Sequence, residues 1–124
     1  MTTTDSPSWI DGRSVDPIYS LLGTQWEQPS LELPARCPIC GAWAVHLFFH
    51  SNPEQDGRTG GGWAWCSQCH GFGHGRWIMP VWWTDMLDLP DDALLFEPIM
   101  MDQIADRIDS HWNGLAGHLH TNPD

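Results

Sequence analysis

The chain contains 124 residues, 16 of them acidic, against five Arg and no Lys, which gives a formal net charge of −11 at pH 7. That charge repels phosphate over a Debye length of ~10 Å, so it disfavours direct nucleic-acid binding and favours a basic protein partner. Neither an apolar run of about 18 residues nor a signal-peptide pattern occurs, so we expect a cytoplasmic protein that does not enter a membrane. The plainer alternative is that the acidic composition does not reflect binding to a partner.

Residues 1–34 are expected to form an irregular N-terminal segment with one short helix and one edge strand. Asp16 is a favourable N-cap, Pro17 suits the first helical position, and Gly23 suits the position after the last. Residues 25–34 are bounded by proline and contain alternating leucines, which is typical of an edge strand.

All four cysteines lie in two Cys-x-x-Cys pairs that are separated by 25 residues. Each pair can place two thiolates on one side of a tight turn, and two such turns complete a tetrahedron around one metal ion. We therefore predict one structural zinc ion, because four protein ligands leave no open coordination position for catalysis. The predicted ligands are Cys37, Cys40, Cys66 and Cys69.

Two alternatives to zinc remain open from the cysteine pattern. The spacing alone does not choose the metal, so an iron–sulfur or rubredoxin-type iron site also fits. Reduced thiols or a redox pair would fit as well, although the chain lacks the βαβ context that is typical of a redox Cys-x-x-Cys.

Residues 35–80 are predicted to form a three-stranded antiparallel zinc ribbon. Residues 42–50 have the length and the aromatic and β-branched content of a strand. Residues 51–62 contain Asn-Pro, Asp-Gly and Gly-Gly-Gly, which are typical of a loop. Residues 63–65 and 72–79 then supply the second and third strands, on either side of the second cysteine pair.

The cysteine segments resemble two known groups of proteins. Cys37-Pro-Ile-Cys40-Gly, with the later Trp-Ala-Trp-Cys-x-x-Cys, resembles small bacterial zinc-ribbon proteins of unassigned function. Cys66-Ser-Gln-Cys69-His-Gly-Phe-Gly also resembles the Cys-x-x-Cys-x-Gly-x-Gly repeat of the DnaJ chaperone cysteine-rich domain. That family uses four repeats and two zinc ions, whereas this chain has one copy. The glycines also have a local explanation, because they permit positive φ and let backbone N–H groups reach the thiolates.

Residues 81–124 are predicted to form an acidic helical extension and a tail, so the expected fold class is α+β. A short helical segment is expected at residues 91–96, and a longer helix from about Pro98 to Asn113, with Gly114 as its stop. The longer helix has an apolar stripe at helical spacing, formed by Met101, Ile104, Ala105, Ile108 and Trp112.

The candidate partner-binding residues lie in the same segment. Trp82 and Trp83 are adjacent in an extended stretch, where neighbouring side chains point to opposite sides, so we expect the pair to be partly exposed. Asp102, Asp106 and Asp109 are spaced to share the helix face opposite the apolar stripe. The alternative for these acids is a solvated helix face without a partner.

The sequence contains no Gly-x-Ser-x-Gly, no His-Glu-x-x-His and no phosphate-binding glycine loop, so we expect no enzymatic activity. The seven histidines are expected to be surface or half-buried groups rather than a second metal site. We interpret the chain as a zinc-stabilised acidic protein-binding module, specifically an inhibitor or immunity-type partner of a basic protein. Two alternatives are a zinc-dependent chaperone that binds unfolded clients and an adaptor bound to the transcription or replication machinery.

Overall fold

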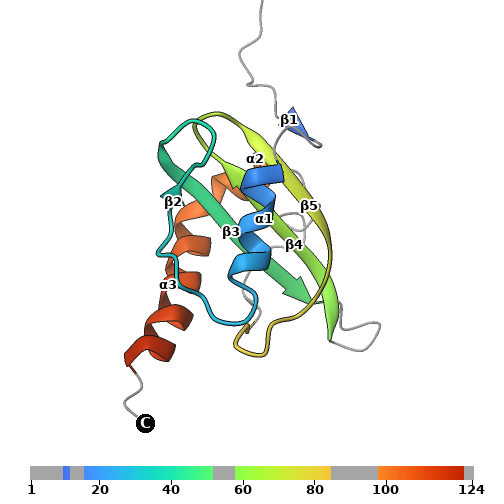
Figure 1. Ribbon diagram of the computed structural model, residues 1–124, viewed down its shortest axis with the longest axis vertical. Helices are drawn as coiled ribbons and strands as arrows, with labels where there is room; N and C mark the ends of the chain where they lie inside the picture. The colour runs from blue at the N-terminus through green and yellow to red at the C-terminus, as the bar shows by residue number, and fades with distance from the viewer. Residues whose placement is uncertain (1–9, 12–15, 52–57, 85–97, 122–124) are drawn as a thin grey trace, which may run out of the picture.

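The computed structural model describes residues 10–11, 16–51, 58–84 and 98–121, and among them the side chains of residues 17–51, 58–84 and 99–117. These ranges contain five strands and three helices (Figure 1). In chain order they are β1 (Ile10–Asp11), α1 (Asp16–Thr24), β2 (Ala35–Arg36), β3 (Trp43–Ser51), β4 (Thr59–Cys66), β5 (Gly71–Ile78), α2 (Pro98–Gln103) and α3 (Ala105–Thr121).

The strands form one sheet in the order β1-β5-β4-β3-β2. The strands β2 to β5 pair antiparallel, while β1 joins the edge of β5 in parallel. The α+β class is therefore confirmed. The prediction of three strands is wrong, because the antiparallel sheet has a fourth strand, β2, and a two-residue strand lies at each edge of the expected ribbon.

The strand β4 begins earlier than predicted, at Thr59 instead of Trp63, inside the expected loop. Its glycines pair with the end of β3, where Ser51 lies opposite Gly60 and Phe49 opposite Gly62. Glycine is disfavoured in strands by intrinsic propensity, but a long partner strand satisfies its backbone N–H and C=O groups. Tertiary pairing thus outweighs the local turn signal.

The predicted edge strand at residues 25–34 is misplaced, because the edge strand β2 follows this segment. The segment runs from the end of α1 toward α3 and then into β2 (Figure 1). Its backbone is held by side chains: Trp112 Nε1 donates to Leu31 O at 3.0 Å, and Asn113 bonds both the N–H and the C=O of Leu33. These bonds replace the strand pairing that the leucine pattern suggested.

The helix α1 packs on one face of the sheet over β4 and β5 (Figure 1). The predicted short helix is confirmed, and its last residue is Thr24, one residue after Gly23. The strand residues beneath it are small. A Cβ added at Gly73 would lie 2.9 Å from Tyr19 Cβ, and one at Gly75 would collide with the Tyr19 hydroxyl. Close approach of the helix therefore requires glycine at these positions in β5.

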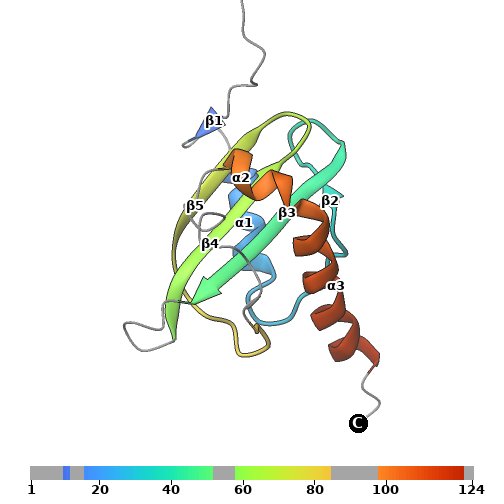
Figure 2. The same ribbon diagram turned by 180° about the vertical axis from the view of Figure 1, so that it is seen from behind.

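The helix α3 lies on the other side of the sheet, beside the outer edge of β3 (Figure 2). Trp112 stacks on Phe49, with ring centroids 6.2 Å apart and planes 14° apart. Trp83 packs edge-on against Phe49, and Trp82 packs edge-on against Trp112 at 5.1 Å. Trp82, Trp83 and Trp112 thus surround Phe49 near the end of β3.

The prediction that Gly114 ends the C-terminal helix is wrong, because α3 continues to Thr121. A Cβ at Gly114 would meet nothing within 4 Å, so this position faces open space. The buried side chains of Trp112 and Ala116 hold the helix against the core on both sides of the glycine. Packing of this kind outweighs a single residue of low helix propensity.

The helix predicted from Pro98 is also interrupted once, since Ile104 lies in a turn between α2 and α3. The helical segment expected at residues 91–96 lies outside the described residues. The predicted apolar stripe does face the core, with Ile104 half-buried and the remaining members buried: Met101, Ala105, Ile108 and Trp112.

One hydrophobic core joins the parts of the chain expected as residues 1–34, 35–80 and 81–124. It combines Ile18 on α1 and Trp65 on β4 with the apolar stripe of α3. No helix in the described ranges has both the length and the apolar character needed to cross a membrane.

Replacing Gly73 by Ala should lower the free energy of unfolding by about 1–3 kcal/mol, because the added methyl group overlaps the Tyr19 side chain. Gly114→Ala is the matched control: it adds the same methyl group in open space on a helix and should raise stability by up to about 1 kcal/mol. Denaturant unfolding of the metal-loaded proteins measures both. Equal effects of the two substitutions would contradict the packing of α1 described above.

Candidate metal centre

Both cysteine pairs lie at the same end of the sheet, in the turns between β2 and β3 and between β4 and β5 (Figure 1). The β3–β4 register sets this arrangement, because it places Cys66 directly opposite Val45, a few residues beyond the first pair. The four Sγ atoms all lie within 4.8 Å of one another. The predicted clustering of Cys37, Cys40, Cys66 and Cys69 is therefore confirmed, and in the described part of the chain it is the only group of its kind.

The sulfur–sulfur distances fit a single metal ion. Cys37 Sγ lies 3.8 Å from Cys69 Sγ, and Cys40 Sγ lies 3.7 Å from Cys66 Sγ. A tetrahedral ion with metal–sulfur bonds of about 2.3 Å separates its ligands by about 3.8 Å, whereas a disulfide requires about 2.05 Å. All four cysteines are free thiols. The group can thus bind one metal ion with its own four ligands.

Backbone N–H groups converge on the first cysteine of each pair. Cys37 Sγ accepts from the N–H of Ile39 at 3.3 Å and of Cys40 at 3.4 Å. Cys66 Sγ accepts from Gln68 N–H and Cys69 N–H at the same two distances. The two turns therefore have matching geometry. Such donors stabilise the negative charge that thiolates keep when they bind a metal.

The environment raises the pKa of two of the thiols and lowers the pKa of a third. Burial raises the pKa of Cys66 to about 12, and burial also raises the pKa of Cys69. A hydrogen bond from the Ala42 backbone lowers the pKa of the exposed Cys40. Without a metal, Cys66 and Cys69 are thus protonated at neutral pH. A metal ion that binds here must displace those protons, so metal affinity falls as the pH falls.

The residue after each pair adopts a left-handed backbone conformation. Gly41 has φ 81°, and His70 occupies the equivalent position of the second turn with φ 64°. The expectation that glycines serve this purpose after the second pair is therefore wrong. Gly71 is not in this conformation but its backbone does bond the Cys69 sulfur, while Gly73 makes room for α1.

A polar network that the sequence did not predict connects the second turn to α3. His46 on β3 bonds Asp109 through Nδ1 at 2.7 Å and the Ser67 hydroxyl through Nε2 at 2.8 Å. The Ser67 hydroxyl donates to Asp102 Oδ1 on α2, and Trp65 Nε1 donates to the same oxygen at 3.0 Å. Ser67 lies between Cys66 and Cys69, so the network ties both C-terminal helices to the metal-binding turn.

The network resembles a Ser–His–Asp triad in composition, but its donors are arranged differently. In a triad the serine hydroxyl points at the histidine and the site keeps backbone N–H groups free for an oxyanion. Here the Ser67 hydroxyl donates to Asp102, and the Ser67 N–H donates to Ala44 O at 2.9 Å. The arrangement satisfies buried polar groups.

The expectation that the three candidate partner-binding aspartates share the helix face opposite the apolar stripe is wrong. Asp109 is 8% exposed and bonded to His46, and Asp102 is half-buried in the same network. Asp106 alone of the three is fully exposed. The spacing pattern did not reveal this difference, because a partner for a buried carboxylate comes from a distant strand.

The expected partial exposure of the tryptophan pair holds for Trp82 but not for Trp83. Trp83 is 9% exposed, and Trp82 is half-buried with its Nε1 donating to Trp26 O at 2.8 Å. Both rings belong to the aromatic cluster around Trp112. The exposed aromatic side chain lies elsewhere: Trp43, at the start of β3 beside the first cysteine pair, is 70% exposed. The position of Trp43, close to a Cys-x-x-Cys turn, was the feature of the sequence that could have identified this exposed side chain.

Comparison with known proteins gave no match to a protein-family model, to a curated protein or to a solved structure. The resemblances to zinc-ribbon proteins and to the DnaJ repeat therefore rest on the two cysteine motifs and the residues next to them alone.

Substituting Ser67 by Ala should lower the free energy of unfolding by about 1–3 kcal/mol, because His46 Nε2 and Asp102 both lose a buried hydrogen-bond partner. Ser20→Ala is the control, since Ser20 is exposed and its hydroxyl bonds only Pro17 O within α1; its effect should stay within about 0.5 kcal/mol. Thermal or denaturant unfolding compares the two. A Ser67→Ala protein as stable as the control would show that the network contributes nothing.

Proposed function

We propose that the chain is a protein-binding module whose fold is stabilised by one structural zinc ion. The observation that carries the proposal is the surface at the metal end of the sheet. Trp43 and Ile39 are 70% and 48% exposed there, on or next to a turn that the metal would hold rigid. Large aromatic side chains fixed on a rigid element are typical centres of protein interfaces.

The zinc assignment is supported by the closed set of four thiols from two matching turns. Such sites contain zinc in most small domains, and their metal supplies folding energy of about 10–16 kcal/mol in zinc-finger peptides. All four coordination positions are filled by protein, so the ion has a structural function and no position for a substrate.

The charge distribution supports a basic partner. The described side chains include five acidic residues and four arginines, which nearly cancel. Eleven acidic residues and one arginine belong to the rest of the chain, and five of those acids fall within residues 85–97. The excess of acidic over basic residues in the whole chain suits electrostatic attraction of a basic protein, followed by contact at Trp43. Asp106 adds an exposed acid on α3.

The inhibitor or immunity-type version of this function follows from the same charges, because an acidic chain can cover the basic surface of a nucleic-acid-acting protein. The chaperone version is favoured by one specific observation: additional apolar side chains, Ile78 and Val81, are exposed near the end of β5. Scattered exposed apolar groups suit broad client binding, whereas a single metal-end surface suits one partner.

The zinc proposal predicts that elemental analysis of the purified chain finds one zinc ion per molecule. Cys66→Ser should abolish both the bound metal and cooperative unfolding, because Cys66 is a buried ligand. Iron in place of zinc, or a Cys66→Ser protein that still unfolds cooperatively with full metal content, would contradict the assignment.

The partner proposal predicts that a protein captured by the full chain is basic and that its affinity falls as the salt concentration rises. Trp43→Ala should weaken that affinity by about tenfold or more, the size typical of a hot-spot residue. Val81→Ala, at 97% exposed, is the control because it removes an exposed apolar group away from the metal end.

An affinity that is insensitive to salt and to Trp43→Ala would refute this version of the function. Suppression of client aggregation by the pure chain, with equal loss on Trp43→Ala and Val81→Ala, would favour the chaperone instead.

A further inference from the structure

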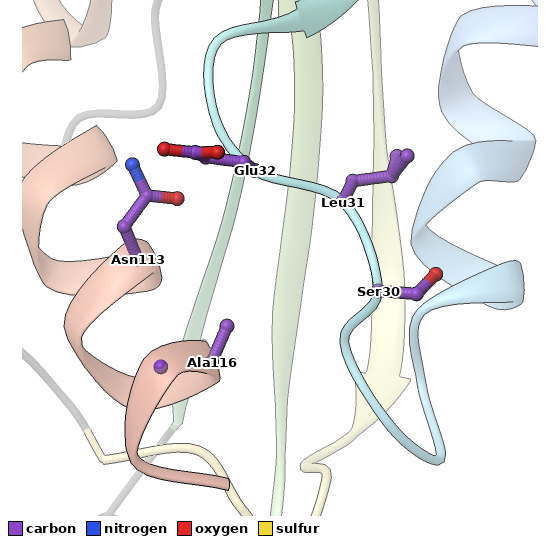
Figure 3. Close-up of a pocket in the computed structure, with 6 residues that line it drawn as sticks. Ser30, Leu31, Glu32, Asn113 and Ala116 are labelled. Atoms are coloured by element: carbon purple, nitrogen blue, oxygen red, sulfur yellow. The ribbon is translucent and has the colours of Figure 1, made fainter. Parts of the chain in front are cut away.

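A hollow of about 340 Å³ separates the segment before β2 from the second half of α3 (Figure 3). This groove is lined by Ser30, Leu31, Glu32, Asn113, Ala116 and Gly117. Its volume is at the low end of the range for ligand sites, so it suits one side chain rather than a large molecule.

The wall on the loop side of the groove is fixed by Gln25, which directly follows α1. Gln25, which is 4% exposed, accepts hydrogen bonds through its Oε1 from Ser30 N–H and Leu31 N–H. The Ser30 hydroxyl donates to the same oxygen. Figure 3 accordingly shows the Ser30 and Leu31 side chains directed toward α1, away from α3.

The same wall is fixed from α3. Trp112 Nε1 donates to Leu31 O, and the Asn113 amide bonds the N–H and the C=O of Leu33, each at 2.8 Å. Both polar atoms of Asn113 are therefore engaged. A groove held open in this way needs no ordering when a ligand enters, which favours binding.

Glu32 is the charged group of the groove. Its side chain is exposed and extends toward α3, beside Asn113 (Figure 3). Among the described residues its carboxylate has neither a hydrogen-bond nor an ion-pair partner. Arg36, four residues further on, is directed elsewhere: its guanidinium reaches toward Gly41 at the metal end. The negative charge of Glu32 is thus not neutralised by this neighbour.

The helix side adds a second negative contribution and an apolar floor. Gly117 lies close to the C-terminus of α3, which ends at Thr121, and the carbonyl end of a helix favours cations. Ala116 and Gly117 are small, so the surface beneath Glu32 is shallow and has room for a methylene chain.

We propose that this groove receives an Arg or Lys side chain of the partner protein. The cationic head would bond the Glu32 carboxylate near the end of α3, and the methylene stem would lie on Ala116 and Gly117, as long basic side chains do on apolar surface. The inference rests on the proposed function in one respect, namely that the partner is a basic protein. The groove adjoins the segment that leads into β2, and Trp43 lies opposite Arg36 of β2.

The test uses Nα-acetyl-arginine amide as the probe, titrated into the metal-loaded full chain and followed by amide chemical shifts. We expect shifts at residues 30–32 and 113–117, and at least tenfold weaker binding by Glu32→Gln. Glu27→Gln is the matched control, because Glu27 is also exposed and the change in net charge is the same, but it does not line the groove. Its affinity should stay within twofold of the parent.

A second variant tests the groove without changing charge. A Cβ at Gly117 meets nothing within 4 Å, so Gly117→Leu should fold normally while its side chain fills the groove and removes binding. Equal binding of the neutral analogue Nα-acetyl-citrulline amide, equal loss in Glu27→Gln, or unchanged binding in Gly117→Leu would overturn the proposal.

The groove and the wider function fail in different ways. If the captured basic partner keeps its affinity for Glu32→Gln, the groove proposal falls while the partner proposal stands. If the arginine probe binds as expected but the full chain captures no basic protein, the groove stands as a cation site and the partner proposal falls.

Discussion

The convergence of four sulfur atoms at one end of the sheet is the constraint on which the rest of the structure depends. It fixes the β2–β3 and β4–β5 turns relative to each other, and the β3–β4 register, which places Cys66 opposite Val45, is compatible with it. Ser67, inside the second turn, connects this turn to β3 and α2, because its hydroxyl contacts both His46 and Asp102. The position of both C-terminal helices is thereby coupled to the candidate metal site. Loss of a metal ion bound there would therefore affect the packing of both helices.

The acidic composition has two separate uses in this chain. Asp102 and Asp109 are part of the buried network, where a carboxylate is tolerated because donors from the sheet satisfy it. Most other acids belong to segments at the ends of the chain and to residues 52–57 and 85–97. Among the described side chains, Glu32 is an exposed acid on a segment that hydrogen bonds from Trp112 and Asn113 hold in place.

The glycines after the second cysteine pair are required by the structure, but not for the reason that the short motif suggests. Cys-x-x-Cys-x-Gly-x-Gly suggests glycines that serve the metal turn, yet His70 takes the left-handed conformation and Gly73 lies under Tyr19. A histidine tolerates that conformation better than most residues with a Cβ, so no local rule forbids it. The requirement at Gly73 comes from a helix more than 40 residues earlier in the chain, which no local pattern contains.

The sequence by itself determined the α+β class, the four candidate ligands, the first helix, the strand β3 and the apolar stripe of the C-terminal helix. These features depend on spacing, periodicity and capping, which are local properties of the chain. Only the tertiary structure decided the edge strands, the extension of β4 through its glycines and the burial of Trp83 and Asp109. The physical reason is the same in each case: a backbone group, an indole or a carboxylate is placed by its partner, and the partners come from distant parts of the chain.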